Sequence, residues 1–305
     1  MPESDQFWDF YWEMRLQGLQ NLGKKQAILA ISRLIRQLAQ TARQPLRLLE
    51  LGCGEAQIIG ALVEGHAQVC SSSKSVGVDY LHTSIETCRR DYPALTFIEG
   101  DFTDPALLET LGHFDIVMLV NALHEVFSTT YSEALGEVDV TAARLRVEQA
   151  FARIVERVAP GGFLVLFDGL EPPGDRGQKV RLRFRHAQAR EHFETFAREY
   201  RPFHIAYRNL GGPFRVELSR RDFTRYITKS IFLGKRLWQT ERLESYQYFN
   251  ETEFRALFAA HRLAIRELRT LTVDAEKWRS VVEIETPGEE FPEEHILIIA
   301  QRGAS

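Results

Sequence analysis

The sequence predicts a doubly wound α/β fold, in which helices cover both faces of a mostly parallel sheet. Two observations lead to this prediction. Between residues 46 and 170, short apolar stretches alternate with stretches that have helical periodicity. The apolar stretches are also nearly continuous, which is typical of parallel strands buried on both faces.

The alternation places each element of this region. Strands are expected at 46–51, 75–80, 95–101, 114–120 and 160–169. Helices are expected between them at 56–66, 81–92 and 142–159. An earlier helix is expected at 25–40, because one face of it is apolar, and Pro45 ends the segment. That face carries Ile28, Ile31, Leu34, Ile35 and Leu38.

Four segments are expected along the chain. Residues 1–45 form a helical segment that begins with Phe7, Trp8, Tyr11 and Trp12, and residues 46–170 form the α/β core. A Pro/Gly linker then opens a helical insertion at 171–249, in which Ser219 and Asp222 mark a helix start. Residues 250–305 close the core with a helix, capped by Asn250 and Glu253, and strands at 278–286 and 294–302.

Composition excludes several classes of protein. The chain has 305 residues, 44% of them hydrophobic, which is enough to bury a substantial core. No apolar run reaches the length of about 18 residues that a membrane span needs, and the N-terminus does not resemble a signal peptide, so we expect a cytoplasmic protein. Cys53, Cys70 and Cys88 have no metal-ligand spacing, so we expect reduced thiols and no metal site.

Charge is distributed unevenly along the chain. Its net charge is −4, yet residues 171–250 contain 17 Lys and Arg against 9 Asp and Glu. Aromatic residues are interleaved with these cations, as in Tyr200, Tyr207, Tyr226, Trp238 and Tyr246 among Arg181, Arg183, Arg185, Arg225, Lys229 and Arg236. Such a segment could line a lid over an anionic or aromatic small molecule, could bind single-stranded nucleic acid, or could simply pack against an acidic core.

A glycine turn follows the first strand and indicates a cofactor site. Glu50 ends the strand, and Gly52 and Gly54 precede a helix, at the sheet edge where ligands of this fold bind. A dinucleotide fingerprint requires glycine where Gln57 stands, and the phosphate-binding G-K-[ST] sequence is absent. Asp79, at the end of the second strand, can accept hydrogen bonds from both hydroxyls of a ribose. A ligand with a ribose but no pyrophosphate fits best.

Five motifs, in this order and spacing, resemble the class I S-adenosylmethionine-dependent methyltransferases. They are LLELGCGEA, VGVDY, FIEGDF, FDIVMLVNALHEVF and APGGFLVLFDG. The resemblance implies a Rossmann-like, seven-stranded sheet whose last strand is antiparallel. It covers residues 46–170, and the final helix and strands resemble the closing antiparallel pair of that family.

The resemblance also implies a set of cofactor-binding residues. Glu50, Gly52, Cys53 and Gly54 would line the methionine part of S-adenosylmethionine, and Asp79 would hold its ribose. Tyr80, Asp101 and Phe102 would surround the adenine, while Asn121 and Ala122 would lie beside the sulfonium. Ala56 departs from the family, which commonly has glycine there, so we expect a tighter turn that still binds the cofactor.

Three polar residues follow the fourth and fifth strands. His124 is the first candidate for a catalytic base or substrate-positioning residue, because histidine titrates near neutral pH. It could equally cap its helix or pack silently beneath the cofactor. Glu125 is expected to be structural, since negative charge is favourable in the first turn of a helix. Asp168, at the tip of the fifth strand, could bind a substrate amine or orient His124.

These observations favour a methyltransferase acting on an O or N atom of a small molecule, with S-adenosylhomocysteine as the second product. An RNA or protein methyltransferase that docks through the basic insertion is the alternative, as is a cofactor-binding protein without turnover. The sequence pI of about 6.2 and the absence of an N/D-P-P-Y/F motif disfavour nucleic acid. A monomer or a homodimer is expected.

Overall fold

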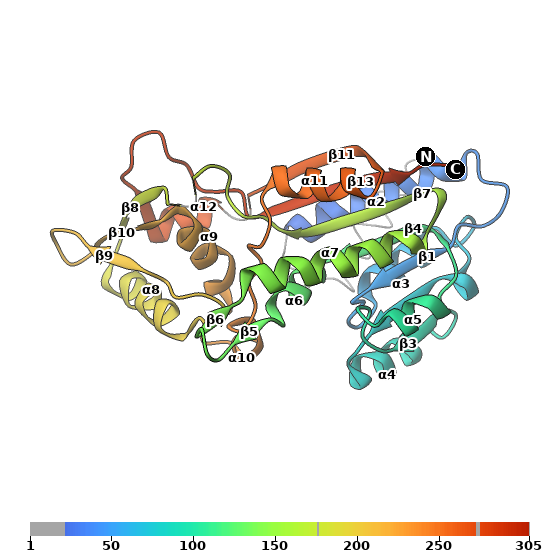
Figure 1. Ribbon diagram of the computed structural model, residues 1–305, viewed down its shortest axis with the longest axis horizontal. Helices are drawn as coiled ribbons and strands as arrows, with labels where there is room; N and C mark the ends of the chain where they lie inside the picture. The colour runs from blue at the N-terminus through green and yellow to red at the C-terminus, as the bar shows by residue number, and fades with distance from the viewer. Residues whose placement is uncertain (1–21, 176, 273–274, 305) are drawn as a thin grey trace.

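The computed structural model describes residues 22–175, 177–272 and 275–304. It consists of two lobes, a core that contains the large sheet and a smaller cap that lies beside one end of that sheet (Figure 1). The long strand β7 and the helix α7 run from the core toward the cap. The cap therefore meets the core at one end of its strands.

The core sheet has seven strands, as predicted. In sheet order they are β3 (Thr96–Glu99), β2 (Val76–Asp79), β1 (Leu48–Leu51), β4 (Phe114–Val120), β7 (Val158–Gly169), β13 (His295–Arg302) and β11 (Leu263–Leu271). Neighbouring strands from β3 to β7 are parallel, and β13 is antiparallel to both of its neighbours. The doubly wound fold and its antiparallel last strand are thus confirmed.

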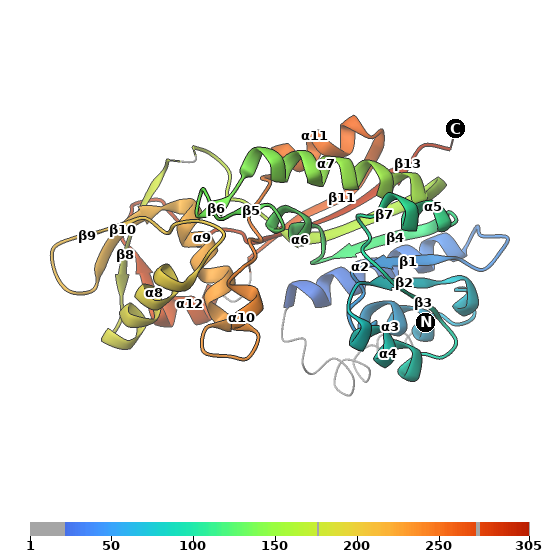
Figure 2. The ribbon, with the colours of Figure 1, turned by 60° about the horizontal axis from the view of Figure 1, so that its bottom comes forward.

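Helices cover both faces of this sheet (Figure 2). One face packs against α2 (Leu22–Ala39), α3 (Gln57–Gly65) and α4 (His82–Asp91). The other packs against α5 (Pro105–Thr110), α6 (Leu123–Ser128), α7 (Val140–Arg157) and α11 (Glu251–Ala260). The apolar face predicted for the first of these helices is correct, because Ile28, Ile31, Leu34 and Ile35 are buried. Residues 1–21, which include Phe7, Trp8, Tyr11 and Trp12, lie outside the described residues.

The cap contains the predicted helices and a sheet that was not predicted. Its helical elements are α8 (Ala187–Glu199), α9 (Arg220–Lys229), η2 (Ser230–Phe232), α10 (Trp238–Glu241) and α12 (Ala275–Val281). Its antiparallel sheet has the order β12 (Val282–Ile284), β8 (Lys179–Phe184), β10 (Arg215–Ser219) and β9 (Tyr207–Asn209). The short elements β5 (Tyr131–Ser132), β6 (Glu137–Val138) and η1 (Ser72–Lys74) lie in connections of the core.

One predicted core strand is wrong. The stretch 278–286 was expected to pair with the last strand, but it forms the end of α12 (Ala275–Val281) and then β12, which joins the cap sheet. The partner of β13 is instead β11. This edge strand carries charged side chains such as Glu267 and Arg269, so its apolar signal is weak. The chain therefore returns to the cap after α11 and β11.

Both predicted helix caps in the later part of the chain are confirmed. The backbone N–H of Asp222 donates to Ser219 Oγ over 3.0 Å. Asn250 and Glu253 form a reciprocal capping box at the start of α11. Within the described residues, no helix is both long and apolar enough to cross a lipid bilayer.

Candidate active site

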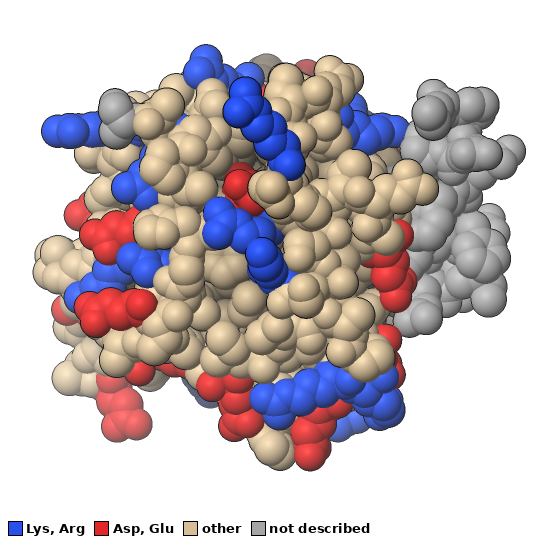
Figure 3. All heavy atoms as spheres, turned by 90° about the vertical axis from the view of Figure 1, so that its right-hand side faces the viewer, with Lys and Arg blue, Asp and Glu red and all other residues tan. Residues whose placement is uncertain are grey.

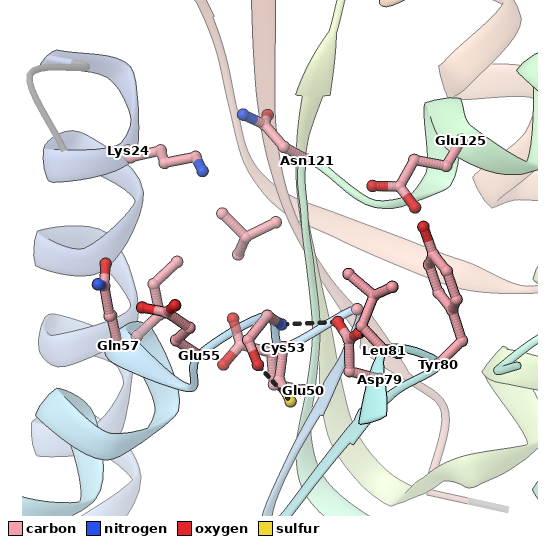
Figure 4. Close-up of a pocket in the computed structure, with 14 residues that line it drawn as sticks. Lys24, Glu50, Cys53, Glu55, Gln57, Asp79, Tyr80, Leu81, Asn121 and Glu125 are labelled. Atoms are coloured by element: carbon pink, nitrogen blue, oxygen red, sulfur yellow. Dashed lines mark hydrogen bonds between the residues drawn. The ribbon is translucent and has the colours of Figure 1, made fainter. Parts of the chain in front are cut away.

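A cavity of about 320 Å³ opens at the carboxyl ends of β1, β2 and β4 (Figure 4). The sheet order reverses here, because β1 lies between β2 and β4, and such a switch point is where doubly wound sheets bind ligands. Seven of the predicted cofactor residues line it: Glu50, Gly52, Cys53, Gly54, Asp79, Tyr80 and Asn121. The structure therefore brings together residues from three separate strands.

The two glycines of the turn are needed for different reasons. Gly52 has a φ of +72°, and a Cβ there would lie 2.7 Å from the Cβ of Ala122. Gly54 has a φ of +52°, but a Cβ there would meet nothing within 4 Å. Gly52 thus lets two chain segments pack closely, while Gly54 leaves its side of the turn open. Ala122 is buried against Gly52 and does not line the cavity.

Ala56, the departure from the family pattern, adopts a left-handed conformation with a φ of +57°. It stands at the N-terminus of α3 and is completely buried. Alanine in this conformation costs about 1 kcal/mol relative to glycine. The turn therefore keeps the backbone shape that glycine would favour, although its residue is alanine.

Asp79 fixes the glycine turn. Its Oδ2 accepts a hydrogen bond from the backbone N–H of Gly54 over 2.8 Å, and its Oδ1 accepts one from Leu81 over 2.9 Å. Each carboxylate oxygen can accept a second bond. Asp79 can therefore hold the turn and still accept bonds from two ligand hydroxyls.

Glu50 is an unusual carboxyl group because it is buried. Its Oε2 accepts a hydrogen bond from the backbone N–H of Ile59 over 3.0 Å. Burial raises the pKa of Glu50 to about 8, against the opposing influence of that bond and of the positive charge on Lys24. A cationic ligand group beside Glu50 would favour its ionised form.

A second cavity, of about 440 Å³, adjoins the first. Asp101 and Phe102 line it, and Tyr80 and Glu125 line both cavities. The Tyr80 side chain is 58% exposed, so its ring stands free at the boundary between the two. Asp101 Oδ1 accepts a hydrogen bond from the backbone of Thr103, which fixes the loop after β3.

Asn121 directly follows β4 and adopts a left-handed conformation, with a φ of +53°. Its backbone N–H donates to the carbonyl of Phe167 on β7 over 2.7 Å. A non-glycine residue in this region is strained, and such strain concentrates at functional sites. The strain turns the chain from β4 into α6 directly beside the first cavity.

His124 and Asp168 form a buried pair next to α6. His124 Nδ1 lies 2.7 Å from Asp168 Oδ1, while Asp168 Oδ2 accepts bonds from the His124 backbone and from Tyr248 Oη. Burial lowers the pKa of His124, but the charge of Asp168, its hydrogen bond and the nearby Glu244 outweigh burial and raise it to about 9. The possibility that Asp168 orients His124 agrees with this geometry.

The cap covers His124. Its side chain is 2% exposed, and the ring of Tyr246 lies 4.0 Å from its own, centroid to centroid. His124 Nε2 is 3.7 Å from Glu244 Oε2, which is beyond hydrogen-bond distance. Glu244 and Glu241 also bind the buried ammonium group of Lys229. His124 lines neither of the two cavities.

From the sequence, we expected the His124 side chain to face the ligand and the Glu125 side chain to stabilise its own helix. In the structure these orientations are reversed. Glu125 lines both cavities, and its carboxyl group lies close to the Tyr80 hydroxyl in Figure 4. Burial raises the pKa of Glu125 to about 7; the charges of Glu244, Asp168 and Asp79 add to this effect, and that of His124 opposes it.

Lys24 is a further lining residue that the sequence analysis missed. It lies on α2 and extends toward the first cavity (Figure 4). Burial lowers the pKa of Lys24, while the charge of Glu50 opposes that shift. A lysine in the first turn of an amphipathic helix resembles any solvated surface charge, so nothing in the sequence distinguished it.

The cations of the cap are largely neutralised by neighbouring carboxylates. Arg181 and Arg208 bind Glu217, Arg183 and Arg185 bind Glu283, Arg215 binds Glu285, and Arg220 approaches Glu289. The aromatic residues Tyr200, Tyr226, Trp238 and Tyr246 are buried. At the opposite end of the molecule, basic and acidic side chains are interspersed on the surface (Figure 3).

Comparison with known families identifies the core. Residues 48–162 match the family model described as a methyltransferase domain. A search of curated proteins finds no match. This match agrees with the motifs in the sequence, so residues 48–162 form a class I methyltransferase domain whose cofactor is S-adenosylmethionine. The resemblance seen in the sequence is thereby confirmed.

Solved structures with a similar fold include an O-methyltransferase family protein from Burkholderia thailandensis, with 13% identity and a TM-score of 0.46. The match covers 91% of this chain and 56% of that one, so this chain spans about half of its length. Magnesium protoporphyrin IX methyltransferase from Synechocystis, solved with bound cofactor, has 11% identity and a TM-score of 0.45, covering 92% of this chain and 81% of that one.

A third match is a SAM-dependent methyltransferase from Methanosarcina mazei, with 14% identity and a TM-score of 0.43, covering 87% of this chain and 96% of that one.

Proposed function

We propose that the protein transfers the methyl group of S-adenosylmethionine to an O or N atom of a small molecule. The observation that carries the proposal is the pair of adjoining cavities, of about 320 and 440 Å³. Sites for cofactors and small ligands commonly have volumes of about 300 to 1,000 Å³. Together, the two cavities offer space for the cofactor and a compact acceptor.

The cofactor residues are assigned in the same proposal. Glu50 and the turn from Gly52 to Gly54 would hold the methionine part, and Asp79 the ribose. Asp101, Phe102 and Tyr80 would surround the adenine. The open side of Gly54 and the spare acceptor capacity of Asp79 support this assignment.

S-adenosylmethionine supplies an already activated methyl group, so positioning the acceptor in line with it can provide much of the catalysis. An O or N acceptor must also lose a proton, and His124 is one proposed base. Asp168 would hold its ring in place, as the third member of a triad does. Reaching His124 Nε2 would require the Tyr246 ring to move aside.

The paired charges of the cap count against an RNA acceptor. Binding to nucleic acid depends on cations that are available to phosphates. Arginines that already bind carboxylates, such as Arg183 with Glu283, would have to break those ion pairs first.

The test uses methyl-labelled S-adenosylmethionine and a host extract separated into metabolite, RNA and protein fractions. Label in metabolites other than S-adenosylmethionine itself is the expected result. Label confined to RNA or protein would contradict a small-molecule acceptor, and label in no fraction would contradict turnover with host acceptors. In a parallel assay, His124→Ala should reduce turnover but leave cofactor affinity near that of the wild type.

A further inference from the structure

We propose that the acceptor is an amine and that Glu125 receives its proton. This inference rests on the proposed function and adds the chemical class of the acceptor and a second catalytic residue. It starts from the charges that line the two cavities and from the position of Glu125 between them.

Carboxyl groups outnumber cations around the two cavities. Six acidic side chains contribute to the linings: Glu50, Glu55, Asp79, Asp101, Glu125 and Glu244. The cations in the same linings are Lys24 and Arg146. A surplus of negative charge attracts cationic ligands and repels anionic ones. The linings therefore disfavour the anionic acceptor that the basic insertion suggested.

Part of this negative charge is already balanced. Glu244 binds Lys229 of α9, and Lys24 lies near Glu50. Asp79 is bonded to two backbone N–H groups. Glu125 differs from these residues, because no hydrogen bond or ion pair joins its carboxyl group to another residue in the described part of the chain. A half-buried carboxylate without a partner is costly unless a ligand supplies one.

The position of Glu125 suits a group that contacts the acceptor. It lies in the first turn of α6, four residues after Asn121, and belongs to both linings. Its carboxyl group points into the space between Tyr80 and Asn121 in Figure 4. The charged groups that affect the pKa of Glu125 are His124, Glu244, Asp168 and Asp79.

The proposed reaction is balanced in protons and electrons. An acceptor ammonium group, R–NH₃⁺, binds the Glu125 carboxylate and transfers one proton to it, which leaves R–NH₂ and a neutral carboxylic acid. The nitrogen lone pair then forms the new N–C bond as the C–S bond breaks and its electron pair stays on sulfur. The products are R–NH₂⁺–CH₃ and S-adenosylhomocysteine.

The test extends the labelling experiment with the full chain. Labelled products are first separated from unreacted S-adenosylmethionine, which is itself cationic. They are then passed over a cation-exchange resin at neutral pH, and the fraction that binds is compared with the rest. We expect the label in the bound, cationic fraction. Label in neutral or anionic metabolites would overturn the amine assignment while leaving the proposed function intact, whereas no label in any metabolite would count against the proposed function itself.

The role of Glu125 is tested with variants on the labelled acceptor. Glu125→Gln should lower kcat at least about a hundredfold, which is a typical contribution of a general base, while Glu125→Asp should retain part of the rate. Glu148→Gln, an exposed change on α7, is the control. Cofactor affinity, measured by calorimetry, should stay within twofold. An unchanged kcat in Glu125→Gln, or equal losses of kcat and cofactor affinity, would overturn the catalytic role.

Discussion

The carboxyl edge of the core and the cap use charged residues in different ways. At the core edge, Glu125 has no partner within the described residues, Glu50 is buried with a raised pKa, and Asn121 has a strained backbone. In the cap, charged side chains are joined in ion pairs, as Arg183 is with Glu283 and Arg208 with Glu217.

This difference separates the part of the molecule suited to bind ligands from the part that supports it. Ion pairs within the protein stabilise a surface. Charged groups that are already paired in this way contribute little to binding a ligand. Unpartnered and strained groups have an energetic cost that a ligand can offset, and such groups cluster at functional sites. The predictions below compare changes in the two regions.

The largest effect is expected for Asp79→Ala at the core edge. The change removes the carboxylate that holds Gly54 and Leu81 and is proposed to bind the ribose. Cofactor affinity should fall about a hundredfold, equal to about 2.7 kcal/mol. Calorimetric titration would measure this loss, with the exposed Asp91→Ala as control. An unchanged Kd would remove Asp79 from the binding site.

A smaller effect, on kcat, is expected when the pH is varied. If Glu125 is the base, kcat should rise about tenfold per pH unit as its carboxyl group ionises, and level off above pH about 7. The rise should disappear in Glu125→Gln. A midpoint near 9 would instead indicate His124, whose pKa is raised to about 9 by Asp168 and Glu244. Initial rates at saturating substrates distinguish the two.

The smallest effect is expected in the cap. Arg183→Ala breaks an ion pair whose side chains are 48% and 35% exposed. Solvent screens such exposed pairs, so the free energy of unfolding should stay close to that of the wild type and kcat should not change. Denaturant unfolding and the labelling assay would measure both. A large loss of kcat would show that the cap cations act on the substrate.

Much of the core could be predicted from the sequence because its strands are buried on both faces. Runs such as 114–120 give a strong signal, and the glycine turn fixes where the ligand site lies. The strand β11 was missed because it is an edge strand with charged residues in its middle, and 278–286, which is richer in β-branched residues, competed for its place. The pairing of β12 with β8 joins residues about 100 positions apart, which local patterns do not reveal.

For the site, the positions of several residues were predicted correctly, but the orientations of others were not. Backbone motifs placed Glu50, Gly54 and Asp79 correctly at one cavity. The roles of His124 and Glu125 depend on orientation, because successive residues of a helix point about 100° apart. An error of one residue in where α6 begins therefore exchanges the side chain that faces the cavity for the one that is buried. The covering of His124 by Tyr246 is a tertiary contact that the sequence did not indicate.

The most direct test is a crystal structure with S-adenosylhomocysteine bound. We predict that its ribose hydroxyls will contact Asp79, that its amino acid part will lie beside Glu50 and Gly54, and that its sulfur will face the space between Asn121 and Glu125. A ligand bound elsewhere, or one whose sulfur faces away from Glu125, would contradict the proposal that methyl transfer takes place at this edge of the core.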